Sequence, residues 1–181
     1  MATLTLFGHP PLLLSNKATE PFVSVEKISG FWGRLIFLSH KKEGSKLTRM
    51  DARVLNECER LSFENKAAFP EIIRRLAETG VERYCADLVR LEKFYYSADG
   101  QNLTEAIPLK DAPKIGSVFQ ATQVQEAIRA IQQGKIDYPE FLKRIMKAGV
   151  VYYDVFVDGR RTIYTGRSGD FHVENFPGGD K

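Results

Sequence analysis

The sequence predicts an α+β fold for residues 50–181, built by tandem duplication of a helix–helix–three-strand unit with pseudo-twofold symmetry. The chain matches itself after a shift of 69 residues, so that residues 50–108 align with residues 119–177 without gaps. Of the 59 aligned pairs, 14 are identical, whereas average composition would give about three or four. Each half also has two stretches of helical periodicity before a β-rich stretch. Helices and strands grouped in this way, rather than alternating, are typical of α+β folds.

The identical pairs fall where helices and turns are expected to begin or end, and at aromatic positions in the expected strands. They include Pro70 and Pro139, Gly80 and Gly149, Gly100 and Gly169, Tyr84 and Tyr153, and Tyr95 and Tyr164. A repeat that preserves such positions predicts the same elements in both halves.

The first predicted helix of each half spans residues 51–62 and 121–133, where apolar residues recur on one face. Gly134 follows the second of these, as glycine often does at a helix C-terminus. The next helix of each half has a proline in its first turn, where the missing N–H costs nothing. Asp137 is placed to cap the second of these helices. Gly80 and Gly149 are expected to end them, because glycine tolerates the left-handed conformation.

The β-rich stretches span residues 84–96 and 150–164. Asp158-Gly159 is a strong hairpin signal in the second half, whereas its counterpart Val89-Arg90 is not. A second turn is predicted at residues 98–100 and 167–169, before a third strand that ends at Pro108 or Pro177. Residues 109–118 form a linker. The sequence leaves open whether the strands form two short sheets or one continuous sheet.

Residues 1–49 keep no strand or helix period for long, and they show no clear signal peptide. Three interpretations remain open. The segment is a disordered or weakly ordered extension, an arm that binds a partner through Phe31, Trp32 and Phe37, or a translation artefact with the true start at Met50.

Composition argues against several classes of protein. The chain is 43% hydrophobic and 27% charged, and no run approaches the roughly 18–20 apolar residues of a membrane-spanning helix. Cys58 and Cys85 are too few for a disulfide framework and are typical of reduced core residues in a cytoplasmic protein. Residues 1–49 carry a net charge of +4 and the remainder −1, so the basic charge gives no support for nucleic-acid binding by the folded part.

Three phrases of the sequence, YPEFLKRI at residues 138–145, GRSGDFHVE at 166–174 and ADLVR at 86–90, resemble one protein family. It is the bacterial and prophage family catalogued as domain of unknown function 1398, some of whose members are labelled phage envelope protein. The resemblance covers residues 50 to about 178. It implies no established activity, substrate or catalytic residue.

Common catalytic motifs are absent from the sequence. It contains no phosphate-binding glycine loop, no dinucleotide fingerprint and no Gly-x-Ser-x-Gly elbow. Of the three histidines, His9 and His40 lie in the first 49 residues, so the spacing predicts no metal site and no cofactor.

The best remaining acid–base cluster is His172 with Asp170 and Glu174 on the last predicted strand. Strand alternation would place all three on one face, so a carboxylate could reach the imidazole. Leu103 occupies the matching position in the first half. The competing interpretation is a half-exposed strand that carries polar residues for solubility alone.

Tyr84, Tyr95, Tyr153 and Tyr164 recur at equivalent positions and are candidates for a binding platform. Sheet packing with the hydroxyls at the rim is the competing interpretation. Asp87 and Arg90 could pair locally or line a groove between the halves.

These observations favour a non-catalytic binding or interaction module of bacterial or prophage origin, acting through a groove between the halves or a self-association surface. A homo-oligomer is therefore one expected partner, and nucleic acid and membrane are not. The alternative is a small-molecule hydrolase or lyase that uses His172, Glu174 and Asp87 as acid–base groups, which requires these side chains to converge in one pocket.

Overall fold

A computed structural model describes residues 50–176. The interpretations of residues 1–49, and the proline at position 177, lie outside these residues. The described elements, in chain order, are α1 (Ala52–Phe63), α2 (Phe69–Glu78), β1 (Val81–Asp87), β2 (Glu92–Ser97), β3 (Asn102–Ala106), α3 (Ala121–Gln132), α4 (Tyr138–Lys147), β4 (Val150–Phe156), β5 (Arg161–Gly166) and β6 (Phe171–Asn175). The order helix–helix–strand–strand–strand therefore occurs twice, and the predicted α+β fold is confirmed.

The helix ends follow the local signals in the sequence. The side chain of Asp137 accepts a hydrogen bond from the backbone N–H of Glu140 (2.8 Å) and caps α4 as predicted. Gly80 and Gly149 follow α2 and α4 with φ values of 85° and 89°, which is the left-handed conformation expected of glycine there. Gly134, with φ 66°, follows α3 in the same way.

The strands form one continuous antiparallel sheet in the order β3-β2-β1-β4-β5-β6. The two central strands, β1 and β4, belong to different halves of the chain and pair with Cys85 opposite Asp154. The sheet therefore joins the halves edge to edge, which decides between the two arrangements that the sequence left open.

The hairpins are confirmed, and Asp158-Gly159 lies in the turn between β4 and β5 as predicted. The connection between β4 and β5 has four residues, and its left-handed residue is Arg160 (φ 49°) rather than Gly159. The connection between β1 and β2 also has four residues and ends with Leu91 at φ 54°. A four-residue loop is most often built around a type I turn, so it does not depend on the Asp-Gly pair that favours a two-residue turn.

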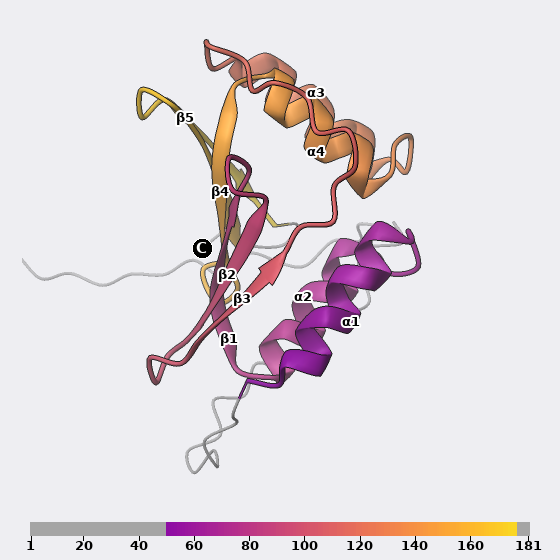
Figure 1. Ribbon diagram of the computed structural model, residues 1–181, viewed down its shortest axis with the longest axis vertical. Coiled ribbons are helices and arrows are strands. Elements are labelled where there is room, and N and C mark those ends of the chain that lie inside the picture. Colours follow the sequence, from indigo (N-terminus) through magenta and orange to yellow (C-terminus); the bar gives the residue numbers. More distant parts are fainter. Residues whose placement is uncertain (1–49, 177–181) are drawn as a thin grey trace, which may run out of the picture. The chain divides into compact units, whose positions relative to one another are not determined.

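All four helices lie on one side of the sheet (Figure 1). Helix α1 contacts the edge strand β3 and helix α3 contacts the opposite edge strand β6, while α2 and α4 pack on β1 and β4. The core lies between the helices and this face of the sheet.

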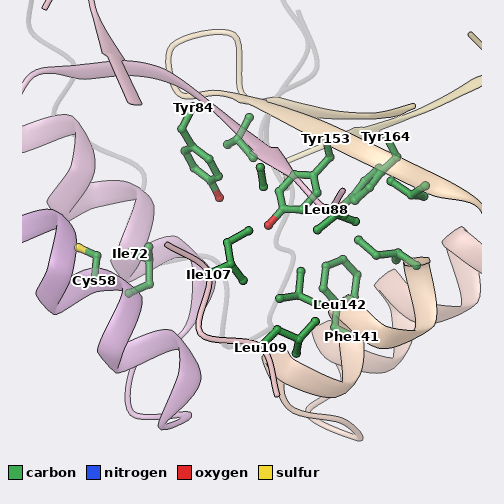
Figure 2. Close-up of a cluster of buried hydrophobic side chains, with 14 of the residues drawn as sticks. Cys58, Ile72, Tyr84, Leu88, Ile107, Leu109, Phe141, Leu142, Tyr153 and Tyr164 are labelled. Carbon is green, nitrogen blue, oxygen red and sulfur yellow. The ribbon is translucent and has the colours of Figure 1, made fainter. Parts of the chain in front are cut away.

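The segment that leaves β3 enters the core between the two pairs of helices. Ile107 and Leu109 are buried and lie between the helix pairs, below Tyr84 and Tyr153 (Figure 2). Ile107 donates its backbone N–H to the carbonyl of Leu91 (2.8 Å). The start of the connection between the halves is therefore part of the core and not a free linker.

Candidate functional site

His172 lies in the middle of β6, on the face of the sheet that the helices cover. Its Cα is paired with that of buried Tyr164, and the two rings stack with centroids 6.3 Å apart. The Nε2 atom is buried without a hydrogen-bond partner among residues 50–176, and it lies 3.6 Å from a carboxylate oxygen of Glu174. That carboxylate accepts a hydrogen bond from Gln132 of α3 (3.1 Å). The structure therefore brings His172 and Glu174 together, packed beneath a helix.

The structure separates Asp87 from this pair. Asp87 follows Ala86, which is buried on the helix side, so alternation turns Asp87 to the opposite face. Strands β4 and β5 lie between β1 and β6, and three strand spacings amount to about 14 Å. Asp87 instead accepts hydrogen bonds from the backbone N–H groups of Val89 and Arg90 (both 2.9 Å), and so stabilises the turn after β1. Because His172, Glu174 and Asp87 do not converge, the geometry does not support their acting as one acid–base site.

The four recurring tyrosines line up within the core. Tyr84, Tyr95, Tyr153 and Tyr164 are all buried. Ring centroids are 5.5 Å apart in the pair Tyr84–Tyr95, 6.4 Å in Tyr84–Tyr153 and 5.5 Å in Tyr153–Tyr164. The hydroxyls of Tyr84 and Tyr153 point inward, toward Ile107 (Figure 2). These rings therefore pack under the helices and offer no exposed platform for a ligand.

Arg90 is exposed in the turn between β1 and β2. Its Nε donates to a carboxylate oxygen of Glu92 (2.6 Å), and its guanidinium lies 5.8 Å from the ring centroid of Phe94. The sequence suggested that Arg90 pairs with Asp87. The contact in the structure is the hydrogen bond from the backbone N–H of Arg90 to the carboxylate of Asp87.

Sequence analysis missed a buried ion pair between Lys93 of β2 and Glu59 of α1. Both side chains are almost fully buried, with 6% and 7% of their surface exposed. The ammonium lies 4.9 Å from the ring centroid of Tyr138 and 5.6 Å from that of Tyr84. Burial is the largest single effect on the pKa of Lys93 and lowers it. The charge of Glu59, together with the neighbouring Tyr95, Tyr153 and Tyr84, more than offsets burial, so this pKa lies well above its usual value. Lys93 is two residues before Tyr95 on β2, so strand alternation alone could have placed its side chain on the buried face of the sheet.

The opposite side of the sheet carries no helix of residues 50–176, and we call it the open face. Strand pairing arranges its side chains in three rows that cross all six strands. The middle row is Thr104, Phe94, Cys85, Asp154, Ile163 and Val173. The row that contains Arg83 is Asn102, Tyr96, Arg83, Phe156, Arg161 and Asn175. The row that contains Asp87 is Ala106, Glu92, Asp87, Tyr152, Thr165 and Phe171.

Aromatic and aliphatic side chains occupy much of the open face. Phe171, Val173 and Tyr152 are exposed, with 64%, 38% and 37% of their surface accessible. Near the centre, Arg83 donates to Asp154 (2.8 Å), and its guanidinium lies 4.2 Å from the ring centroid of Tyr96. Contiguous exposed apolar surface of this kind is typical of interaction sites and ligand-binding grooves.

Within the described residues, no group of three or more His, Cys, Asp or Glu side chains could hold a metal ion. In the same part of the chain, no helix has the length and apolar character needed to cross a membrane.

Part of the chain matches a known protein family. Residues 104–175 match DUF1398, a family described as a protein of unknown function. The DUF1398 match confirms the resemblance and runs from the middle of β3 to the end of β6. It is narrower than the range expected from the sequence, which began at residue 50.

Two similar proteins extend the likeness beyond the DUF1398 segment. An uncharacterised protein of Mycobacterium tuberculosis and one of Mycobacterium bovis are each 27% identical to this chain over 133 residues, which is 71% of this chain and 81% of the relative. An alignment of that length includes residues of the first half as well. Neither the DUF1398 description nor these names assign an activity.

Cys85, at the centre of the open face, is expected to be a poor nucleophile. Burial, together with the nearby carboxylate of Asp154, raises the pKa of its thiol to about 12. At pH 8 the folded protein should therefore hold on the order of 10³-fold less thiolate at this position than free cysteine does. We expect slow alkylation by iodoacetamide in a Cys58→Ala chain, a faster reaction in denaturant, and a faster reaction in folded Asp154→Asn. Alkylation of the folded chain at the rate of free cysteine would contradict the expectation.

Proposed function

We propose that this protein is a non-catalytic interaction module of bacterial or prophage origin, which acts in the cytoplasm and self-associates through the open face of its sheet. The functional unit is residues 50–181. The observation that carries the proposal is the exposure of Phe171, Val173 and Tyr152 on a face that no helix of residues 50–176 covers. The occupant of that face is a second copy of the same chain.

The charge and the size of the face support a second copy as the partner. The face carries both basic and acidic side chains around its apolar positions, so it can be complementary to itself. Six strands about 4.8 Å apart and five residues long span roughly 24 by 17 Å, or about 400 Å² of flat area. Protruding side chains add to this area, which brings the face toward the lower range of specific interfaces, about 600 Å² per partner. A dimer of this size is expected to form at micromolar concentration.

Tandem duplication is part of the same proposal, with halves 50–108 and 119–177. It is supported by elements of equal length in the two halves, 12, 10, 7, 6 and 5 residues. It is also supported by two reciprocal backbone hydrogen bonds, in each of which the residue just after one central strand donates to the other central strand. The backbone N–H of Leu88 donates to the carbonyl of Val151, and that of Val157 donates to the carbonyl of Glu82, both at 2.9 Å. The two donors are 69 residues apart in the sequence, and so are the two acceptors. A pseudo-twofold axis would pass between Cys85 and Asp154.

The proposal is tested by the mass of the full chain in solution. We expect sedimentation velocity to show a dimer of the 20.5 kDa chain at micromolar concentration. Val173→Glu places a carboxylate in the open face and is expected to raise the dissociation constant at least about tenfold, because an unpaired charge would be buried. Val118→Glu is the matched control, since Val118 is 67% exposed in the connection before α3, outside the sheet.

The control variant should dimerise as the unaltered chain does. A chain that stays monomeric at about 100 µM, well above the micromolar range expected for such an interface, would contradict the proposal. Equal dissociation constants for the Val173→Glu and Val118→Glu dimers would also contradict the proposal, provided that circular dichroism shows both variants to be folded.

A further inference from the structure

We infer that the two copies pack with each strand opposite the same strand of its partner, and with the Arg83 row of one copy opposite the Asp87 row of the other. The inference rests on the proposed self-association and names its geometry. It would make Val173 lie opposite Val173 of the partner subunit, and Thr104 opposite Thr104 of the partner subunit.

Shape alone allows two arrangements. Two copies that use the same face are related by a twofold axis in the plane between them. When the axis runs along the strands, every row meets itself and β6 lies over the partner's β3. When it runs across the strands, every strand meets itself and the two outer rows meet each other. Because the two halves of the sheet have the same layout, both arrangements bring apolar positions of the middle row together.

The charged side chains of the open face distinguish the two arrangements. Arg83 and Arg161 lie in one outer row, and Asp87 and Glu92 lie in the other. An axis along the strands would place Arg83 opposite the partner's Phe156 and Asp87 opposite the partner's Tyr152. Neither charge would then meet a counter-ion across the interface, and burying a charge without one is costly. An axis across the strands places Arg83 opposite the partner's Asp87. The same axis places Asp154 opposite the partner's Asp154, but each of these carboxylates already has Arg83 of its own chain as a counter-ion. The charges of the two outer rows therefore select the axis across the strands.

Arg83 has the capacity for this second contact. Its NH1 group donates to Asp154 within the same chain, which leaves further N–H donors of the guanidinium for a carboxylate of the partner. Its side chain is 34% exposed, and that of Asp154 is 18% exposed. The internal ion pair and the stacking on Tyr96 hold the guanidinium in place beforehand, which lowers the entropy that the contact would cost.

Cross-linking of single cysteines tests the geometry. In a full-length Cys58→Ala, Cys85→Ser background, Val173→Cys and Thr104→Cys are prepared separately, one of them with a tag that adds mass. These positions share the middle row but lie on the two edge strands, five strand spacings or about 24 Å apart. Facing sheets are about 10 Å apart, so a short bismaleimide can join opposite positions but cannot reach across the face.

With the axis across the strands, each variant cross-links to itself and a mixture of the two gives several-fold less of the mixed product. The reverse pattern, mixed product with little self-product, would overturn the inferred geometry and leave self-association standing. A dimer in sedimentation that gives neither product would also overturn the geometry. A monomer in sedimentation would overturn self-association itself, so the two failures are distinguishable.

Discussion

Lys93→Met is expected to destabilise the fold by about 3–5 kcal/mol, because it leaves the carboxylate of Glu59 buried without its counter-ion. The pair lies in the core with both side chains almost fully buried, and one carboxylate oxygen of Glu59 already lacks a hydrogen-bond partner within residues 50–176. The loss comes from the unpaired charge and not from the removal of an attractive contact. Guanidinium unfolding of the full chain would measure it as a change in midpoint at constant slope.

The double variant Glu59→Ile, Lys93→Met separates these two causes. Under the proposed duplication, Ile128 of α3 matches Glu59 of α1. Ile128 is buried, which makes isoleucine the residue of choice at position 59. Replacing a buried ion pair by apolar residues of similar volume is often neutral or stabilising. We therefore expect the double variant to lie within about 1 kcal/mol of the unaltered chain. Equal losses in the single and double variants would show that packing, not charge, accounts for the effect.

The dependence of stability on pH gives a second measurement of the same pair. The folded pKa of Lys93 lies above the usual 10.5, so its contribution to stability is complete below that pH and is lost as the pH rises through the folded value. Burial also raises the pKa of Tyr84 to about 12, which acts in the same direction above pH 10. In the double variant the loss of stability at alkaline pH should be smaller, because the contribution of Lys93 is gone and that of Tyr84 remains.

Sequence analysis predicted the elements of this fold because their signals are local. Proline in the first turn, a capping aspartate and a glycine after each helix act through the backbone of a few neighbouring residues. The pairing of β1 with β4 has no such signal, since it depends on two strands about 70 residues apart in the sequence meeting at the centre of the sheet. For this reason the sequence left one sheet or two as alternatives.

The candidate site was harder to predict for the same physical reason. Alternation places His172 and Glu174 on one face of one strand, and the structure agrees. It says nothing of which strands separate β6 from β1, so the distance to Asp87 could not be foreseen. Lys93 could have been recognised on a buried face by its spacing from Tyr95, but its partner Glu59 comes from helix packing. The open face was visible in part, because Phe94 and Tyr96 alternate with buried residues on the same strand.

Gly149→Ala is expected to be the other strongly destabilising change, at about 3 kcal/mol or more, because strain and overpacking act together there. Gly149 has φ 89°, a conformation that costs an alanine roughly 1–2 kcal/mol. In addition, a Cβ atom at this position would lie 2.3 Å from the backbone oxygen of Val118. That oxygen is not free to move, because the neighbouring Gly116 and Gln120 donate backbone hydrogen bonds to Met146 and Ala148 (both 2.9 Å). The connection before α3 is thus fastened over the end of α4.

Gly169→Ala is the matched control for this prediction. Gly169 has nearly the same backbone angle, φ 86°, but a Cβ atom there would meet nothing within 4 Å. We expect it to lose only the conformational cost of about 1–2 kcal/mol. The difference in unfolding free energy between the two variants then measures the contact with the backbone at Val118 alone. If both variants lose the same amount, the connection can give way at little cost, and its close packing against α4 does not contribute to stability.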